Sequence, residues 1–483
     1  MEALLAKQTP RLLVIQSPAN MRLQLIINAI LAPVATSTQV ANFNVSSSVA
    51  AEYGCNGACY EAFRAGIAED FAEFGALYNE SFYATAKNFS CSAPGDLLKY
   101  QPIDPQTIAG SVPKGITVYR IQYTSVDLFN NTVPVTGFIA FPYANRTNGH
   151  LYRTVAWAHG TSGVFRGCAP SAMPDLYEYD SWSYLIERGY AVIATDYAGL
   201  GNNYTSHPYS ALAAHANDVF YSVAAARKLF GSYLTAEWMS IGHSEGGGSV
   251  WALAESALLG NASSMAGKYL GTVAQAPAVF QGQQALAAVQ STENSTSEAD
   301  SPADTVGELG WAVIGFQNLF PNETLSWLDP TYQKRLALAK KAQACYDSME
   351  AIATGLDLDQ IIDLSDATVA MQALRVIGTI DELTAVGNSK SGQPVLVVQG
   401  LADVSVLPEV VESAYNVTCE TGSVVHLQLY PGLDHDPLIP AAAPSFLQWM
   451  DDRFDGVTAE EKCSKKTVYP FNSKYLYAPL DED

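Results

Sequence analysis

The chain has 483 residues, of which 48% are hydrophobic and 15% charged, and its formal net charge at pH 7 is -22. This length and composition predict a globular protein, built as one large α/β domain with insertions or as two domains, and they exclude a disordered or fibrous chain. The acidic balance argues against binding to nucleic acid or to anionic membranes, and it suits a protein that works in mildly acid surroundings.

Residues 1–41 are expected to be a signal peptide or N-terminal extension. Met21-Arg22 gives a basic start, residues 23–31 are apolar, and Ala35-Thr36-Ser37 offers small residues for cleavage. The residues before Met21 fit either an upstream start codon or a longer basic region, and a buried amphipathic helix is the alternative to a signal peptide. No later apolar run is long enough to span a bilayer, so we expect a soluble, secreted protein.

Glycosylation sequons and cysteines agree with export. The Asn-x-Ser/Thr sequons spread over most of the chain, and the candidates are Asn44, Asn79, Asn88, Asn130, Asn145, Asn203, Asn261, Asn294, Asn322 and Asn416. The seven cysteines match no zinc-binding spacing. In an exported chain they are expected to form disulfides with one cysteine left over.

The first elements are predicted to lie at the margin of the fold. Residues 50–89 are rich in alanine and aromatic residues with helical spacing, and we expect them to pack outside the core. Residues 116–123 and 133–140 have strand composition and flank a turn-prone stretch, which predicts an antiparallel pair at one edge of a sheet. Pro134 fits an edge strand.

Strands and helices then alternate. Strands are predicted at 153–158, 190–195 and 271–276, and a helix at 211–230 leads into a further strand that ends near residue 243. This alternation predicts a mostly parallel sheet with helices on both faces. Functional residues are therefore expected at the carboxyl ends of the strands.

Residues 282–390 interrupt this alternation. Helical spacing over 332–352, 356–364 and 367–383 predicts a helical lid or cap over the site rather than a separate domain. The expected organisation is a core in two parts, 42–281 and 391–483, with the lid inserted between them. In the second part the predicted elements are a strand at 394–400, a helix at 408–415, a strand at 424–430 and a helix at 443–454.

Gly242-His243-Ser244-Glu245-Gly246 stands between an apolar strand and a helix-forming stretch. This Gly-x-Ser-x-Gly pattern predicts a nucleophile elbow, in which Ser244 lies at the tip of a sharp turn with its hydroxyl exposed. The two flanking glycines are expected because the strand and helix backbones pass too close for side chains.

A serine nucleophile needs a base, and the base needs an acid that orients it. Asp403 follows the strand at 394–400, and His435 follows the strand at 424–430, so these two residues are the candidate acid and base. The other histidines precede the serine or lie in positions without a pattern, and we expect them to be structural. Three rival acids are expected to be solvated, loop-capping or structural, namely Asp434, Asp436 and Asp196.

The oxyanion of an acyl-transfer intermediate needs two donors. The N-H of Glu245, at the start of a helix, is the expected first donor. The second is expected from the loop His159-Gly160-Thr161, with Thr161 as the candidate. Loss of one such donor costs roughly 3 to 4 kcal/mol in the transition state. The Glu245 carboxylate itself has no role in this interpretation.

Three motifs together resemble the secretory lipase family, which has an α/β-hydrolase fold. They are Ala156-Trp157-Ala158-His159-Gly160-Thr161-Ser162-Gly163 with the later Cys168-Ala169-Pro170-Ser171, then Thr195-Asp196-Tyr197-Ala198-Gly199-Leu200-Gly201, and the elbow. The resemblance implies a Ser-Asp-His triad on Ser244, Asp403 and His435 and a helical lid between elbow and acid. It also implies disulfides between Cys168 and Cys345 and between Cys419 and Cys463, with Cys59 to Cys91 as a weaker guess.

Glu245 departs from the family pattern, in which a neutral residue more often follows the serine.

The expected function is a secreted serine hydrolase that cleaves carboxylic esters without a metal or organic cofactor. The expected partners are a small-molecule or lipid ester and a transient lipid interface, with no nucleic acid and no obligate protein partner. A biosynthetic hydrolase or acyltransferase specific for one secondary metabolite is the alternative, and a hydrolase-fold binding protein is a third hypothesis.

Overall fold

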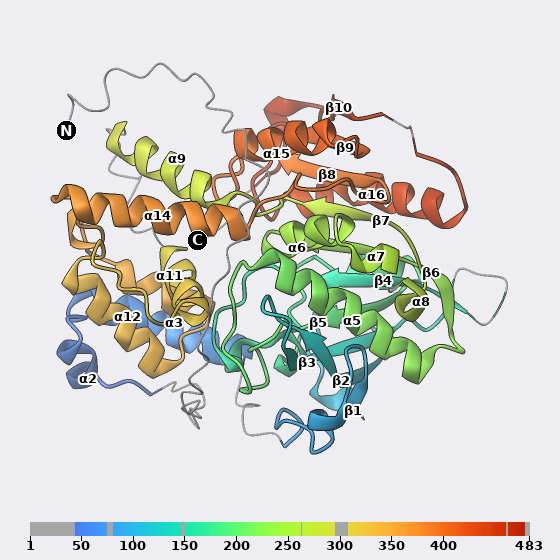
Figure 1. Cartoon of the computed structure of the whole chain (residues 1–483), viewed down its shortest axis with the longest axis horizontal. Helices are drawn as coiled ribbons and strands as arrows, with labels where there is room; N and C mark the ends of the chain where they lie inside the picture. The colour runs from blue at the N-terminus through green and yellow to red at the C-terminus, as the bar shows by residue number, and fades with distance from the viewer. Residues whose placement is uncertain are drawn as a thin grey trace. The chain divides into compact units, whose positions relative to one another are not determined.

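A computed structural model describes residues 44–74, 81–145, 149, 151–261, 263–294, 308–459 and 462–478. The expected signal peptide lies outside these residues, as does the candidate glycosylation site Asn79. The described chain forms one ten-stranded sheet in the order β1-β2-β3-β5-β4-β6-β7-β8-β9-β10 (Figure 1). In the described part, no helix combines the length and the apolar character needed to cross a membrane.

The strands of this sheet are mostly parallel. They are β1 (Leu97–Pro102), β2 (Thr117–Val126), β3 (Thr132–Phe141), β4 (Tyr152–Ala158), β5 (Ala191–Thr195), β6 (Leu234–His243), β7 (Lys268–Gln275), β8 (Val395–Gly400), β9 (Val425–Tyr430) and β10 (Ser464–Thr467). The pairs β1–β2, β2–β3 and β3–β5 are antiparallel. The remaining neighbours, from β5–β4 to β9–β10, are parallel. The predicted α/β fold with a mostly parallel sheet is confirmed.

The predicted antiparallel pair is confirmed as β2 and β3, but its position at the sheet edge is wrong. β1 pairs with β2 and takes the edge, and β5 pairs with β3 over Gly137–Ala140. Pro134 lies opposite Thr124, in the part of β3 that has no pairing with β5. The sheet therefore loses no hydrogen bond through the missing N-H of Pro134.

Helices cover both faces of the sheet, as the alternation in β4 shows. Ala156 and Ala158 contact the hydrophobic cluster that includes α5 (Leu212–Phe230), α6 (Glu245–Ala254) and α15 (Pro408–Glu420). Val155 and Trp157 point to the opposite cluster, which includes α4 (Ser183–Glu187) and α16 (Leu438–Phe454). Successive strand residues face opposite sides, so a strand that is apolar throughout fits a sheet buried on both faces.

The chain between β7 and β8 is helical and shares a hydrophobic cluster with the first helices. The helices are α2 (Ser47–Glu52), α3 (Ala58–Phe74), α9 (Gln281–Asn294), α11 (Leu309–Leu319), α12 (Pro330–Ala342), α13 (Tyr346–Glu350) and α14 (Ala367–Leu383); two short helices, α7 (Leu258–Asn261) and α8 (Ser263–Ala266), precede β7. Phe63 of α3 packs in one cluster with Trp311, Tyr332 and Met349. Figure 1 shows α3 beside α11 and α12, although these helices are far apart in the sequence.

Two expected helices in this segment are interrupted. The helix predicted over 332–352 breaks after α12, because Gln343 adopts a left-handed backbone with φ of 58° and Cys345 is bonded to Cys168. Over 356–364 only a short 3-10 turn forms, at Leu358–Gln360. The backbone nearby bonds to a distant segment instead, through the N-H of Asp363 to the carbonyl of Trp327.

Three disulfides form, and Cys91 is left free and exposed. Cys168–Cys345 and Cys419–Cys463 are the pairs that the family resemblance implies. The suggested pair Cys59–Cys91 is wrong, because Cys59 bonds to Cys55 at a Cα-Cα distance of 5.1 Å. Cys55 lies between α2 and α3, so the first turn of α3 brings Cys59 next to it.

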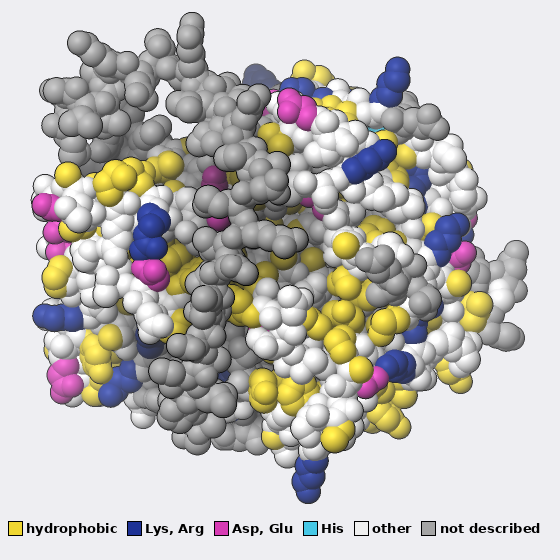
Figure 2. Space-filling model, in the orientation of Figure 1, with side chains coloured by type: hydrophobic (Ala, Val, Ile, Leu, Met, Phe, Trp, Pro, Cys, Tyr) yellow, Lys and Arg dark blue, Asp and Glu magenta, His cyan; other side chains and the backbone are white. Residues whose placement is uncertain are grey.

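Charged side chains are distributed without a dominant patch on the face of the molecule drawn in Figure 2. Among the described residues of that face, Lys and Arg side chains stand singly between polar, acidic and hydrophobic ones. A continuous basic surface for nucleic-acid phosphates is therefore absent from the described part of that face.

The Cys168–Cys345 bond is expected to hold the helical segment to the loop after β4. Replacing both residues with alanine should lower the free energy of unfolding by about 2–5 kcal/mol, because the bond restricts a very long loop in the unfolded chain. The measurement is the denaturant midpoint of the double variant. Cys91→Ser is the matched control and should leave the midpoint unchanged; equal midpoints for parent and double variant would contradict the prediction.

Candidate active site

The turn between β6 and α6 places Ser244 in a strained conformation. Its backbone has φ of 55° and ψ of -121°, in the region that non-glycine residues rarely adopt. Three hydrogen bonds hold it there: the N-H of Ser244 donates to the carbonyl of Gln275 at 3.0 Å, and the Ser244 carbonyl accepts from the N-H groups of Gly248 at 3.1 Å and Ala278 at 2.9 Å. This geometry is typical of a nucleophile elbow.

The glycines on either side of the serine are required by space. A Cβ on Gly242 would lie 2.3 Å from the carbonyl oxygen of Gly246, and a Cβ on Gly246 would lie 2.0 Å from the carbonyl oxygen of Ala158. These are backbone atoms of the neighbouring strand and helix, so they cannot move aside cheaply. The first turn of α6 is thereby pressed against the end of β4.

The candidate acid and base lie at the ends of two adjacent parallel strands, β8 and β9. The Nδ1 of His435 is 2.9 Å from Oδ2 of Asp403, and both side chains are buried. Asp403 also accepts hydrogen bonds from the side-chain amide of Gln399 at 2.9 Å and from the N-H of Val406 at 2.7 Å. These bonds fix the carboxylate, so the Nδ1-H of His435 has an oriented acceptor.

The pKa of His435 follows from this pairing. Burial alone lowers the pKa of the imidazole, but the charge and hydrogen bond of Asp403 outweigh that effect and raise the pKa above its ordinary value. The His435 ring packs against His243, with ring centroids 4.4 Å apart, and His243 directly precedes Ser244. The structure thus brings Asp403, His435 and the elbow to the same corner of the sheet.

The rival acids make other contacts in the described structure. Asp434 is buried and accepts the N-H groups of His435 and Val404, so it caps the loop. Asp436 is half-exposed and lies 3.6 Å from Nε2 of His243. Asp196 accepts from the backbone and hydroxyl of Ser171 and from the hydroxyl of Thr136, which is a structural role.

The loop after β4 lies directly against the elbow. A Cβ on Gly160 would be 3.4 Å from the Cβ of Ser244. The N-H of Gly160 is engaged, since it donates to the hydroxyl of Tyr179 at 3.2 Å. The N-H groups of Thr161 and Glu245 have no acceptor among the described residues. Free N-H groups on both sides of Ser244 are what an oxyanion site requires.

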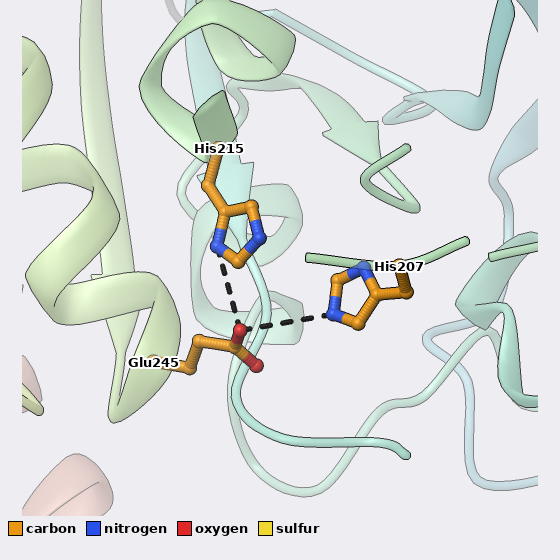
Figure 3. A group of neighbouring side chains, drawn as sticks. All are labelled: His207, His215 and Glu245. Atoms are coloured by element: carbon orange, nitrogen blue, oxygen red, sulfur yellow. Dashed lines mark ion pairs between the residues drawn. The ribbon is translucent and has the colours of Figure 1, made fainter. Parts of the chain in front are cut away.

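The side chain of Glu245 lies in the interior, and sequence reasoning missed its surroundings. Its Oε1 accepts the N-H of Ser210 at 2.9 Å and lies 3.4 Å from Nδ1 of His215 and 3.8 Å from Nε2 of His207 (Figure 3). Burial raises the pKa of Glu245 to about 8. No motif links these positions; the only signal in the sequence is an ionisable residue in a buried elbow.

The mostly parallel sheet with helices on both faces is the fold of an α/β-hydrolase. The candidate residues Ser244, Asp403 and His435 lie at the ends of its strands, in agreement with this class. The family model for secretory lipases matches residues 177–462 of this chain. The chain belongs to the secretory lipase family and is a carboxylic ester hydrolase of the lipase and esterase class. No curated protein sequence matches the chain.

Two solved structures illustrate the similarity of fold. Candida antarctica lipase A in its closed state has a TM-score of 0.63 and 14% identity, with 84% of this chain and 92% of that chain covered. The rice cell wall degrading esterase LipA from Xanthomonas oryzae has a TM-score of 0.55 and 17% identity, with 76% of this chain and 97% of that chain covered. At these identities the comparison shows the shared fold.

A side chain at Gly246 should destroy the elbow. Gly246→Ala forces a Cβ onto the carbonyl of Ala158, so we expect loss of esterase activity and of serine labelling by a fluorophosphonate. Gly260→Ala is the matched control, because it lies in helix α7 with nothing within 4 Å of the added Cβ, and it should behave as the parent. Normal labelling of Gly246→Ala would refute this account of the turn.

The pairing of Asp403 with His435 predicts a pH effect. His435 accepts a proton only when neutral, that is, above its pKa, and Asp403 raises that pKa. Asp403→Asn should therefore move the acidic limb of kcat/KM to lower pH and reduce kcat by about 10⁴-fold.

Asp434→Asn is the control for this pH effect, since Asp434 binds only backbone N-H groups beside the same histidine. Its acidic limb should stay where the parent has it, as measured with a fluorogenic ester. A larger loss of activity in Asp434→Asn than in Asp403→Asn would show that the acid is wrongly assigned.

Proposed function

We propose that the ester hydrolase acts through an acyl-enzyme on Ser244, with His435 as general base and Asp403 as the acid that orients it. The observation that carries this proposal is the 2.9 Å contact between His435 Nδ1 and Asp403 Oδ2, at strand ends that lie beside the strained elbow. Since the Nδ1 proton is directed to the carboxylate, Nε2 keeps the lone pair that takes the serine proton.

In the first half-reaction Ser244 Oγ attacks the ester carbonyl while His435 takes its proton. The π electron pair of the ester C=O bond moves onto the carbonyl oxygen. The N-H groups of Thr161 and Glu245 stabilise the negative charge on that oxygen. When the tetrahedral intermediate collapses, the C-O bond to the alcohol breaks. The protonated imidazole of His435 then gives its proton to the leaving alcohol. Water then repeats these steps on the acyl-serine and releases the carboxylic acid.

The loop that supplies Thr161 is held in place by tyrosines. The Thr161 hydroxyl is 2.9 Å from the hydroxyl of Tyr209, and its carbonyl accepts a hydrogen bond from the hydroxyl of Tyr177. Glu245 is fixed as the first residue of α6, where the helix dipole favours negative charge. Both donors are therefore pre-oriented before substrate binds, which is the condition for effective oxyanion stabilisation.

A small pocket lies among the helices between β7 and β8. Its lining comes from α9, α11, α14 and the segment before α5, and the residues are Tyr209, Ser210, Gln281, Ala312, Phe316, Ile380, Leu383 and Thr384. Ser210 contacts Glu245, the residue after the proposed nucleophile. We propose that residues 282–390 act as a lid over the acyl chain of a lipid ester.

Secretion is implied by the family, and two observations agree with it. Six cysteines are in disulfides, a state that oxidising compartments sustain. Of the candidate glycosylation sites with described side chains, none is buried, and the exposed ones are Asn44, Asn88, Asn130, Asn322 and Asn416. We propose that the segment 1–41 directs export and that these sequons can be glycosylated.

The experiment that tests the mechanism is hydrolysis of p-nitrophenyl esters from acetate to palmitate. The parent should turn over, faster with longer acyl chains, and Ser244→Ala should lose about 10⁶-fold in kcat. Mass spectrometry of the fluorophosphonate-labelled parent should find the adduct on the peptide that contains Ser244. An adduct on another peptide would refute the nucleophile, and a preference for acetate would refute a lipid ester as the substrate.

A further inference from the structure

Three buried side chains outside the proposed triad converge on one point. His207 comes from the loop between β5 and α5, His215 from the first turn of α5, and Glu245 from the start of α6. All three are at most 1% exposed. Figure 3 shows both imidazoles presenting a ring nitrogen to the same carboxylate oxygen, Oε1 of Glu245. None of these side chains has a part in the proposed mechanism.

The protonation state of His207 follows from its partners. Its Nδ1 lies 2.9 Å from the carbonyl oxygen of Ala198, and a carbonyl can only accept, so Nδ1 carries the proton. In a neutral ring Nε2 then carries a lone pair. That nitrogen is buried, has no hydrogen-bond partner among the described residues, and faces Oε1 of Glu245 across 3.8 Å. Two electron-rich atoms therefore face each other in the interior.

A second imidazole, that of His215, also faces Oε1 of Glu245. Its Nδ1 is 3.4 Å from Oε1 of Glu245 and 3.4 Å from the hydroxyl of Ser249. The Ser249 hydroxyl donates to the carbonyl of Glu245 at 2.8 Å, so toward the His215 ring its oxygen is an acceptor. Metal binding at Nδ1 therefore requires the tautomer of His215 that carries its proton on Nε2. Charge-assisted hydrogen bonds between nitrogen and carboxylate are about 2.7–2.9 Å long. The separations around Glu245 are too wide for direct hydrogen bonds of that kind.

In the part of the chain that the structure describes, no Lys or Arg balances the Glu245 carboxylate. Among the described residues its ion-pair partners are the two histidines alone, with no Lys or Arg. Neutral imidazole is the form of histidine that binds metals. A buried carboxylate in such surroundings needs either a proton or a metal ion.

We propose that His207 Nε2, His215 Nδ1 and the Glu245 carboxylate bind a divalent transition-metal ion, Zn²⁺ by their donor set. Two neutral imidazoles and one carboxylate are a zinc set that leaves one position for water. Tetrahedral ligands at about 2.0–2.1 Å from zinc are roughly 3.3 Å from one another. The separations of 3.4 and 3.8 Å approach that value, and the three donor atoms lie within 4.8 Å of one another.

The surroundings of the three residues support a metal site. A metal-bound histidine usually donates its other ring N-H to a carbonyl or carboxylate, as His207 does to Ala198. The side chains come from two helices and a loop that is bonded to the helix start through Ser210. A cation here would tie the pocket-lining segment at Tyr209 and Ser210 to the elbow, and it would add positive charge behind the N-H of Glu245.

The test is metal analysis of the purified full-length protein. After removal of metal with a chelator and reloading with Zn²⁺, we expect about one zinc ion per chain, and Co²⁺ in its place should give a visible absorption spectrum of a four-coordinate site. Glu245→Gln and His207→Gln should each lower the zinc affinity by at least about tenfold, since loss of a supporting partner alone costs 10–100-fold.

Two controls separate this site from other binding and from catalysis. His426→Gln removes a histidine from β9 and should keep full zinc content, as should Ser244→Ala, whatever the outcome for ester hydrolysis. Protein that takes up no zinc or cobalt would overturn the proposal, and a proton on Glu245 would then neutralise the site. Equal zinc affinity in the parent, Glu245→Gln and His207→Gln would also overturn it. Zinc uptake by the parent tests the proposal directly. The proposal can therefore be refuted even if a variant fails to fold.

Discussion

The backbone of the turn between β6 and α6 approaches the end of β4 so closely that Gly246 can carry no side chain. This contact sets the position of Ser244, whose left-handed conformation is held by bonds to Gln275, Gly248 and Ala278. It also places the first N-H of α6 beside the loop after β4, so the proposed nucleophile and both proposed oxyanion donors are oriented by one packing arrangement. Strain at the serine persists because the surrounding sheet and helix over-determine it.

The rest of the proposed machinery is carried by different elements. Asp403 and His435 stand on loops after β8 and β9, and the parallel register of these strands brings the two side chains within 2.9 Å. The helical segment between β7 and β8 is anchored by its own hydrophobic cluster with α3 and by the Cys168–Cys345 bond. A small pocket lies among these helices and the segment Tyr209-Ser210.

Glu245 combines two functions in one residue on the proposals made above. Its backbone N-H points to the oxyanion, while its side chain extends the other way into a buried group with His207 and His215 (Figure 3). An unpaired carboxylate this close to a developing negative charge would oppose the reaction. On the proposal of a metal site, a cation bound by Glu245, His207 and His215 removes that conflict.

Local patterns in the sequence by themselves determined the alternation of strands and helices, the elbow at Ser244 and the candidates Asp403 and His435, because periodicity and strand-end position are encoded in short stretches. Only the tertiary structure decided that β1 takes the sheet edge, that the helix predicted over 332–352 breaks near Cys345, and that Cys59 pairs with Cys55. It also brought His207 and His215 to Glu245. These features depend on contacts between segments far apart in the chain, or on the exact path of a turn, and neither leaves a period or a spacing in the sequence.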